Sequence, residues 1–167
     1  MLDYRFRPLA RHDLPLVARW RAKPHVSEWW GDPAVEPEAD KLIDPRIAMW
    51  IVERDGWPFA FAQDYDVHGW KPHPFGHLPE GARGIDQYIG EPDMLDRGHG
   101  SAFVRQLVQM LIANGAPAVG TDPHPDNLRA RRAYEKAGFL ATGGPVETPW
   151  GTAILMECWN SSLTATG

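Results

Sequence analysis

The sequence lacks several features that would place it at once in a broad class of protein. Its single cysteine, Cys158, excludes a disulfide framework and a zinc module built on cysteines. No apolar run approaches the roughly 18 residues that a transmembrane helix needs, so no membrane partner is expected. Basic residues are not in excess, since 17 Lys and Arg stand against 22 Asp and Glu, and the net charge of −5 argues against nucleic-acid binding. The first residues, MLDYRFRPLARHD, are charged throughout, unlike a signal peptide, and we expect a cytoplasmic protein.

Tryptophan and acidic residues are unevenly distributed along the chain. Six of the eight tryptophans lie within the first 70 residues, at positions 20, 29, 30, 50, 57 and 70. Between Glu28 and Asp66 ten acidic residues stand against three basic ones, a charge of −7, which leaves +2 for the rest of the chain. Aromatic faces attract ammonium groups and carboxylates pair with them. We therefore expect a small cationic molecule as the partner of this half.

Hydrophobic periodicity and turn signals predict a mixed α/β fold in a single domain, residues 1–160, with a disordered tail at 161–167. Strands are expected at 3–7, 47–53, 57–65, 83–89, 116–121, 139–142 and 152–159, and the pair Asp55-Gly56 is a hairpin turn. Helices are expected at 13–22, 24–30, 103–112 and 126–137, the last ending at Gly138 in a left-handed cap. Residues 31–37 and 67–82 are expected to be loops, and the length of the second indicates a functional or mobile segment.

A glycine-rich segment, Arg97-Gly-His-Gly-Ser-Ala102, leads from a predicted strand into an amphipathic helix. The first backbone N–H groups of a helix have no partner within it, and the helix dipole favours an anion there. Gly98 and Gly100 allow a ligand to approach closely, and Arg97 adds positive charge, with His99 as a second candidate for doing so. A pyrophosphate group suits this site, although a tight turn into the helix is the alternative. The spacing matches neither a P-loop nor a dinucleotide fingerprint.

Two segments carry a resemblance to a known superfamily. Residues 97–102 fit the pattern Gln/Arg-x-x-Gly-x-Gly/Ala, and Asn127–Phe139 matches N-x-x-A-x-x-x-Y-x-K-x-G-F. Both patterns are those of the GNAT superfamily of acyl-CoA N-acyltransferases, which the chain resembles. More narrowly, residues 28–31 (EWWG), 62–65 (AQDY), 83–87 (RGIDQ) and 121–127 (TDPHPDN) are similar, in the same order, to segments of aminoglycoside 6'-N-acetyltransferases. The resemblance spans residues 3–159 and departs in the loop 67–82, which contributes to acceptor choice in such enzymes.

The resemblance implies a mixed, mostly antiparallel central sheet flanked by helices, and direct transfer of an acetyl group from acetyl-CoA to a primary amine in a ternary complex. It implies Asp86 as the base, directly or through water, and Tyr134 as the acid that meets the departing thiolate. The alternatives are an Asp86 that makes only local hydrogen bonds in its strand and a Tyr134 that is merely half-buried on its helix. The strand at 87–89 is expected to splay from its neighbour, so that its backbone groups meet the pantetheine arm and the thioester oxygen.

The residues expected to contact acetyl-CoA are Gln87, Tyr88, Ile89, Arg97, Gly98, His99, Gly100, Ser101, Ala102, Asn127, Tyr134 and Lys136. The residues expected in the acceptor pocket are Glu28, Trp29, Trp30, Gln63, Tyr65, Trp70, Asp86 and Asp122. Because adjacent tryptophans on a helix cannot face the same way, we expect one of Trp29 and Trp30 in the core and the other at the pocket. The histidines of the loop 67–82 lack a cysteine or acidic frame, so no metal is expected.

The leading hypothesis is therefore an N-acetyltransferase acting on an aminoglycoside 6'-amine, as a monomer or a homodimer. A second hypothesis keeps the acyl transfer but changes the acceptor to a siderophore precursor or another small-metabolite amine. A third is a catalytically idle module that binds acyl-CoA or a sugar. The presence of Arg97, Asn127 and Tyr134 together argues against the third hypothesis.

Overall fold

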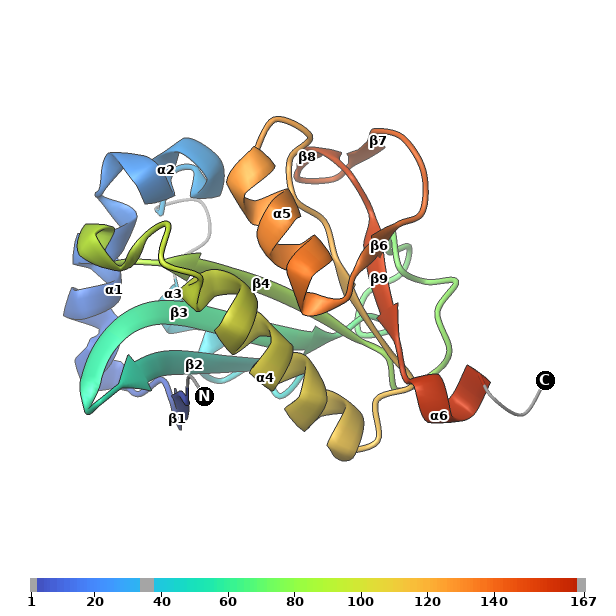
Figure 1. Cartoon of the computed structure of the whole chain (residues 1–167), viewed down its shortest axis with the longest axis horizontal. Coiled ribbons are helices and arrows are strands. Elements are labelled where there is room, and N and C mark those ends of the chain that lie inside the picture. The colour runs from blue at the N-terminus through green and yellow to red at the C-terminus, as the bar shows by residue number, and fades with distance from the viewer. Residues whose placement is uncertain (1–2, 34–37, 165–167) are drawn as a thin grey trace.

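A seven-stranded sheet forms the centre of the computed structural model, which describes residues 3–33 and 38–164 (Figure 1). In spatial order the strands are β1 (Arg5–Pro8), β2 (Ile47–Arg54), β3 (Trp57–Asp66), β4 (Arg83–Ile89), β5 (Ala118–Thr121), β9 (Met156–Trp159) and β6 (Leu140–Ala141). Neighbouring strands of this sheet are antiparallel except β4 and β5, which are parallel. The predicted fold class, a mixed and mostly antiparallel sheet flanked by helices, is confirmed.

Helices cover both faces of the sheet. They are α1 (Leu14–Arg21), α2 (Pro24–Trp30), α3 (Glu38–Lys41), α4 (His99–Ala113), α5 (Leu128–Ala137) and α6 (Ser161–Thr164), with 3₁₀ turns η1 (Arg11–Asp13) and η2 (Pro92–Met94). One core packs α4 and α5 on the sheet through residues such as Phe103, Leu107 and Phe139. The other packs α1 and α2 on the sheet through Val17 and Trp20. None of the helices within residues 3–33 and 38–164 is long and apolar enough to cross a membrane.

Most predicted elements are confirmed, and their boundaries follow local signals. The strand at 83–89 has the predicted bounds. Asp55 and Gly56 both have positive φ angles, 52° and 81°, as a two-residue hairpin turn with the twist of its strands requires. The helix predicted at 126–137 begins only at Leu128, because Asn127 is its N-cap and accepts a hydrogen bond from the N–H of Ala130. Gly138 closes it in the left-handed conformation, as expected.

The prediction of a single strand at 152–159 is wrong. Ile154 and Leu155 interrupt it, so that β8 (Gly151–Ala153) pairs with a strand the sequence did not indicate, β7 (Val146–Thr148), in a separate hairpin. The N–H of Ile154 donates to the carbonyl of Pro123, which takes this residue out of the ladder. The predicted tail differs too, since residues 161–164 form α6. Residues 165–167, and residues 34–37 of the predicted loop 31–37, lie outside the described part.

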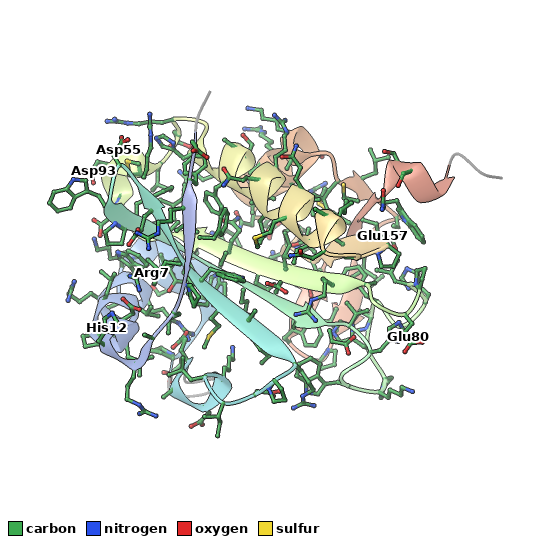
Figure 2. All side chains as sticks on the ribbon, turned by 90° about the horizontal axis from the view of Figure 1, so that it is seen from below. Arg7, His12, Asp55, Glu80, Asp93 and Glu157 are labelled. Atoms are coloured by element: carbon green, nitrogen blue, oxygen red, sulfur yellow. The ribbon has the colours of Figure 1, made fainter. Side chains whose placement is uncertain are left out.

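The long loop at 67–82 is a packed segment. Val67, Phe75, Leu78 and Ala82 are buried in a third core together with Tyr65. Phe75 lies so close to Gly120 that a Cβ there would come within 2.8 Å of its ring. Figure 2 shows Glu80 of this loop at the same end of the molecule as Glu157, opposite the end that carries Asp55 and Asp93. The loop is thus anchored over the strand β5.

Candidate active site

The parallel strands β4 and β5 separate soon after they meet. They pair only at Arg83 with Val119 and at Gly84 with Gly120. A hydrogen bond from Thr121 Oγ1 to the carbonyl of Ile85, at 3.1 Å, follows these pairs. Beyond it, β4 is paired with β3 alone, so its second edge is open toward the helix α5. The splay that the resemblance implied is therefore present.

A cavity lies where this splay opens, and its lining comes from β4, α2 and the first turns of α4 and α5. Figure 1 shows how these elements are arranged. We call it the central cavity. Its lining residues are His25, Trp29, Trp30, Gln87, Tyr88, Ile89, Leu95, Gly100, Asn127, Arg129, Ala130 and Ala133. Small side chains on α5 and a glycine on α4 keep the cavity open, which suits a narrow, extended ligand.

The N-terminus of α4 is built without side-chain capping. Gly98, the N-cap, has a left-handed backbone with φ of 80°, a conformation that glycine adopts without strain. No side chain caps the helix there, so its first N–H groups are left for a ligand. A Cβ on Gly100 would lie 3.8 Å from both Ala133 Cβ and Ile89 Cδ1, so a larger residue would narrow the central cavity. Arg97 is exposed beside this turn, and Ser101 Oγ donates to the carbonyl of Gly98.

His99 does not supply the positive charge that the sequence suggested. Its side chain is buried, with Nδ1 2.8 Å from the Tyr4 hydroxyl and Nε2 3.2 Å from an Arg54 guanidinium nitrogen. Because a guanidinium can only donate, Nε2 accepts and Nδ1 carries the proton. Burial, with the charges of Arg54 and Arg97, lowers the pKa of His99. The imidazole is therefore neutral, and it links Tyr4, just before β1, and Arg54 of β2 to α4.

The helix α5 presents its first half to the central cavity. Asn127 lines the cavity at the N-cap, with its side-chain oxygen on the N–H of Ala130. Tyr134 is buried two turns later, with its hydroxyl 3.5 Å from Gln87 Nε2 and hydrogen-bonded to Thr121. Burial raises the pKa of Tyr134, so the phenol is protonated at neutral pH. Lys136 lies at the exposed last turn, roughly 13 Å along the helix from Asn127, and does not line the cavity.

Two carboxyl groups meet on the other side of β4. Asp86 accepts a hydrogen bond from Gln63 Nε2 of the neighbouring strand at 2.9 Å. Asp122, directly after β5, is hydrogen-bonded to Asp86 and also accepts from the indole N–H of Trp150. Burial, and then the charge of Asp86, raise the pKa of Asp122 well above its ordinary value. Two carboxyl groups this close share one proton, which leaves one negative charge on the pair.

An aromatic cluster lies around this carboxyl pair. Ring centroids are 5.9 Å apart for Tyr65 and Trp70, 5.6 Å for Tyr65 and His73, and 5.5 Å for His73 and Trp150. Arg46 lies over Trp70 at 4.2 Å, so one face of that indole is already covered by a cation. The sequence identified Tyr65 and Trp70 but missed His73 and Trp150. Their positions in a loop and a hairpin turn carried no motif, and only the packing of these segments brings them to the site.

The two adjacent tryptophans of α2 face different ways, as expected. Trp30 packs against Tyr88 at 4.9 Å and Phe61 at 5.6 Å, and belongs to the core on that face. Trp29 is half-buried, with its ring 5.6 Å from His124. Both line the central cavity, but Trp29 is the one turned toward the loop between β5 and α5. Glu28, by contrast, lies on the exposed face of the same helix.

The open edge of β4 is partly occupied. His25 Nε2 lies 2.9 Å from the carbonyl oxygen of Ile89, a contact that the sequence did not indicate. That carbonyl is therefore satisfied within the protein. Backbone groups of alternate residues point to the same edge of a strand, and Ile85 and Ile89 point to the open edge whereas Gly90 bonds Phe59 on the β3 side. The backbone N–H and carbonyl of Gln87 are therefore what remains for a ligand, while the backbone of Tyr88 points to β3. The side chain of Tyr88 points into the core on the α1 and α2 face, where burial raises its pKa.

The loop histidines each have a separate partner. His68 Nε2 contacts the carbonyl of Leu78, His73 Nδ1 accepts from the N–H of Phe75, and His77 contacts Glu157. Across residues 3–33 and 38–164, no three histidine, cysteine or acidic side chains gather where they could hold a metal ion.

The chain belongs to the acetyltransferase (GNAT) domain family, whose model matches residues 10–145. An aminoglycoside N(6')-acetyltransferase type 1 from Klebsiella pneumoniae is 35% identical over 169 residues, which cover 90% of this chain and 80% of that protein. A solved aminoglycoside acetyltransferase in complex with coenzyme A and kanamycin is 33% identical with a TM-score of 0.85, covering 98% of this chain and 99% of that one. An N5-hydroxyornithine acetylase from Beauveria bassiana is 30% identical over 138 residues, 76% of this chain and 24% of that protein.

Proposed function

We propose that the protein transfers an acetyl group from acetyl-CoA directly to the 6'-amine of an aminoglycoside. One observation carries this proposal: a carboxyl pair with a single negative charge and a buried, protonated phenol stand on opposite sides of the same splayed strand. Asp122 contacts Trp150 of the aromatic cluster, whereas the Tyr134 hydroxyl lies against Gln87, which lines the central cavity. A base and an acid are thus available on either side of the gap where a thioester would lie.

The donor side fits acetyl-CoA by its chemistry. The uncapped N-terminus of α4 suits the pyrophosphate, since its N–H groups and dipole favour an anion. Between α4 and α5 the central cavity is narrow and lined by Gly100, Ala130 and Ala133, which suits the pantetheine arm. Asn127 and the backbone groups of Gln87, at the open edge of β4, supply polar partners along the way. An N–H of this edge would stabilise the developing negative charge on the thioester oxygen.

In the transfer step the acceptor nitrogen forms a bond to the thioester carbon while the carbon–sulfur bond breaks. Asp86 takes the proton that the attacking amine loses, and Gln63 holds its carboxylate in place. Tyr134 donates its proton to the departing thiolate. Before this transfer Asp122 carries the shared proton, so the pair has one negative charge, and it is neutral once Asp86 has taken the proton of the amine. The aromatic cluster with this charge suits a polycationic sugar, because aromatic faces stack on sugar rings and attract ammonium groups.

The test is thiol release from acetyl-CoA on addition of kanamycin, compared between the wild type and Asp86→Asn. We expect kcat of the variant to fall about 10²–10⁴-fold, the usual contribution of a general base, while acetyl-CoA affinity, measured by calorimetry, stays within a factor of two or so. Asp93→Asn is the control, because Asp93 is an exposed carboxylate at the end of the molecule away from Glu157 (Figure 2).

A wild-type protein that releases no thiol with any aminoglycoside would sink the acceptor assignment, and an Asp86→Asn variant with unchanged kcat would remove Asp86 as the base. The likeness to the hydroxyornithine acetylase supports a second candidate acceptor, an N-hydroxylated amine. Offering both acceptors at equal concentration separates the two, because only the aminoglycoside carries several ammonium groups for the aromatic and acidic wall.

A further inference from the structure

Trp150 belongs to no motif, yet it occupies the mouth of the acceptor site. It lies in the turn of the hairpin β7–β8, which stands outside the main sheet beside α5 (Figure 1). Its backbone N–H is 3.3 Å from Thr148 Oγ1, and the same hydroxyl bonds the carbonyl of Gly151, so the turn is held from within. Ile154, just after the hairpin, is tied to Pro123. These hydrogen bonds hold the backbone around Trp150, although the residue is 53% exposed.

The indole of Trp150 contacts two other parts of the site. Its N–H donates to Asp122 Oδ2, and its ring lies 5.5 Å from His73 of the loop 67–82. An indole N–H is a single donor with no acceptor capacity, so it can orient a carboxyl group without competing for the proton that the carboxyl pair shares. With one Asp122 oxygen held by the indole, the other is left to face Asp86.

We propose that Trp150 is a positioning residue that holds Asp122 against Asp86, and that its ring, together with His73, forms a wall of the acceptor site. This inference rests on the proposed function, since it assigns the acceptor side of the same site. The indole acts through Asp122 on the proton balance of the pair, whereas the ring acts on the acceptor by stacking. The two roles are separable, because phenylalanine retains a ring and loses the N–H.

The titration of the pair depends on every charged or titratable group that faces it. These are Asp86 on β4, Tyr65 on β3 and Tyr134 on α5, with His73 against the Trp150 ring. A hydrogen bond to a carboxylate favours the ionised form, and the bond from Trp150 lowers the pKa of Asp122 against the larger opposing effects of burial and Asp86. Loss of the N–H therefore lets the pair keep its proton to a higher pH.

The experiment compares Trp150→Phe, Trp150→Ala and Trp159→Phe with the wild type. Trp159 is the matched control, because it is an exposed tryptophan whose N–H also donates to a carboxylate, Glu157, but outside the site. We expect the alkaline limb of kcat/KM, where the pair loses its shared proton, to move up by about half a pH unit or more in Trp150→Phe, with acceptor KM near that of the wild type. Trp150→Ala should show the same shift and raise acceptor KM about threefold to tenfold, the value of one aromatic contact with a cation. Trp159→Phe should match the wild type in both.

The titration is also followed without any acceptor, by the ¹³C carboxyl resonances of Asp86 and Asp122 in the free protein. A pair that titrates at the same pH in Trp150→Phe as in the wild type overturns the positioning role. An unchanged acceptor KM in Trp150→Ala overturns the wall. Failure of the proposed function looks different: the wild type would acetylate no aminoglycoside, while the carboxyl resonances of Trp150→Phe would still shift. Thermal unfolding verifies that each variant is folded.

Discussion

The two sides of the strand β4 are built from different kinds of group. The side proposed for acetyl-CoA, called the donor side, consists of backbone groups, helix N-termini and small residues, with Gly98, Gly100 and Ala133 as examples. The side proposed for the amine, called the acceptor side, consists of large side chains and charges, with Asp86, Asp122 and the aromatic cluster around them. Backbone recognition needs little more than a helix terminus and glycines at the right places. Side-chain recognition can be altered residue by residue, so we expect acceptor choice to vary independently of the donor side.

The largest effect is expected at Tyr134, which lies between the two sides of β4. In Tyr134→Phe the buried ring remains but the proton for the leaving thiolate is lost, so kcat should fall about 100-fold with little change in either KM. Steady-state thiol release measures this. Tyr4→Phe removes another buried phenol hydroxyl, the one on His99, and should retain kcat. Comparable losses in both variants would mean that Tyr134 acts through packing alone.

On the donor side, the sharpest change is Gly100→Val. The added branches would enter the central cavity from a position already 3.8 Å from Ala133 and Ile89, so acetyl-CoA should bind about tenfold more weakly. Isothermal titration measures this affinity. Acceptor KM should stay unchanged, because the acceptor side contributes nothing at this point. Gly143→Val, at a glycine with open space around it, is the control. Equal affinity in both variants would show that the ligand does not pass between α4 and α5.

The smallest expected effect is on stability, at Asp122. Its raised pKa means that folding favours the protonated form, a stabilisation present at low pH and lost as the pH rises through the folded-state pKa. Asp122→Asn cannot ionise but can still accept from Trp150. It should match the wild type in free energy of unfolding near pH 3 and exceed it by at least about 1 kcal/mol near pH 8, roughly the value of a pKa shift of one unit.

Urea denaturation at the two pH values measures this difference at Asp122. Asp126→Asn, at an exposed carboxylate, should show no such dependence on pH. If the wild type is as stable as Asp122→Asn at pH 8, ionisation of Asp122 costs no free energy in the folded state. The two sides of β4 would then differ in shape but not in electrostatics.

The charge pattern shows an expectation from the sequence whose basis the structure does not support. The acidic stretch from Glu28 to Asp66 suggested a surface for a cation. In the structure several of its carboxylates form ion pairs within the fold: Glu38 pairs with Arg21, Asp64 with Arg83 and Glu53 with Arg7. The site's own charge comes from Asp86 and Asp122, outside that stretch. A net charge over a segment cannot distinguish paired from unpaired carboxylates, because pairing is decided by partners elsewhere in the chain.

The positions of the tryptophans likewise could not be judged from their distribution along the chain. Trp20 is buried in the core with its N–H on Glu91, Trp50 bonds Asp64, and Trp57 is exposed beside the hairpin turn at residues 55–56. Of the six early tryptophans that the sequence singled out, only Trp29, Trp30 and Trp70 lie at the central cavity or the aromatic cluster. Trp150, from the other half of the chain, holds the more direct position. Composition indicated the chemistry of the acceptor side but not the residues that supply it.

By itself the sequence determined the strand and helix pattern, the glycine turn into α4, the cap at Asn127 and the αL residue at Gly138. These features depend on neighbours within a few positions, through backbone conformation, helix dipole and local hydrogen bonds. Only the tertiary structure decided that His99 turns inward as a neutral imidazole and that Trp150 reaches Asp122 across 28 positions. Those outcomes depend on burial and on side chains brought together from distant strands and loops, for which no local pattern exists.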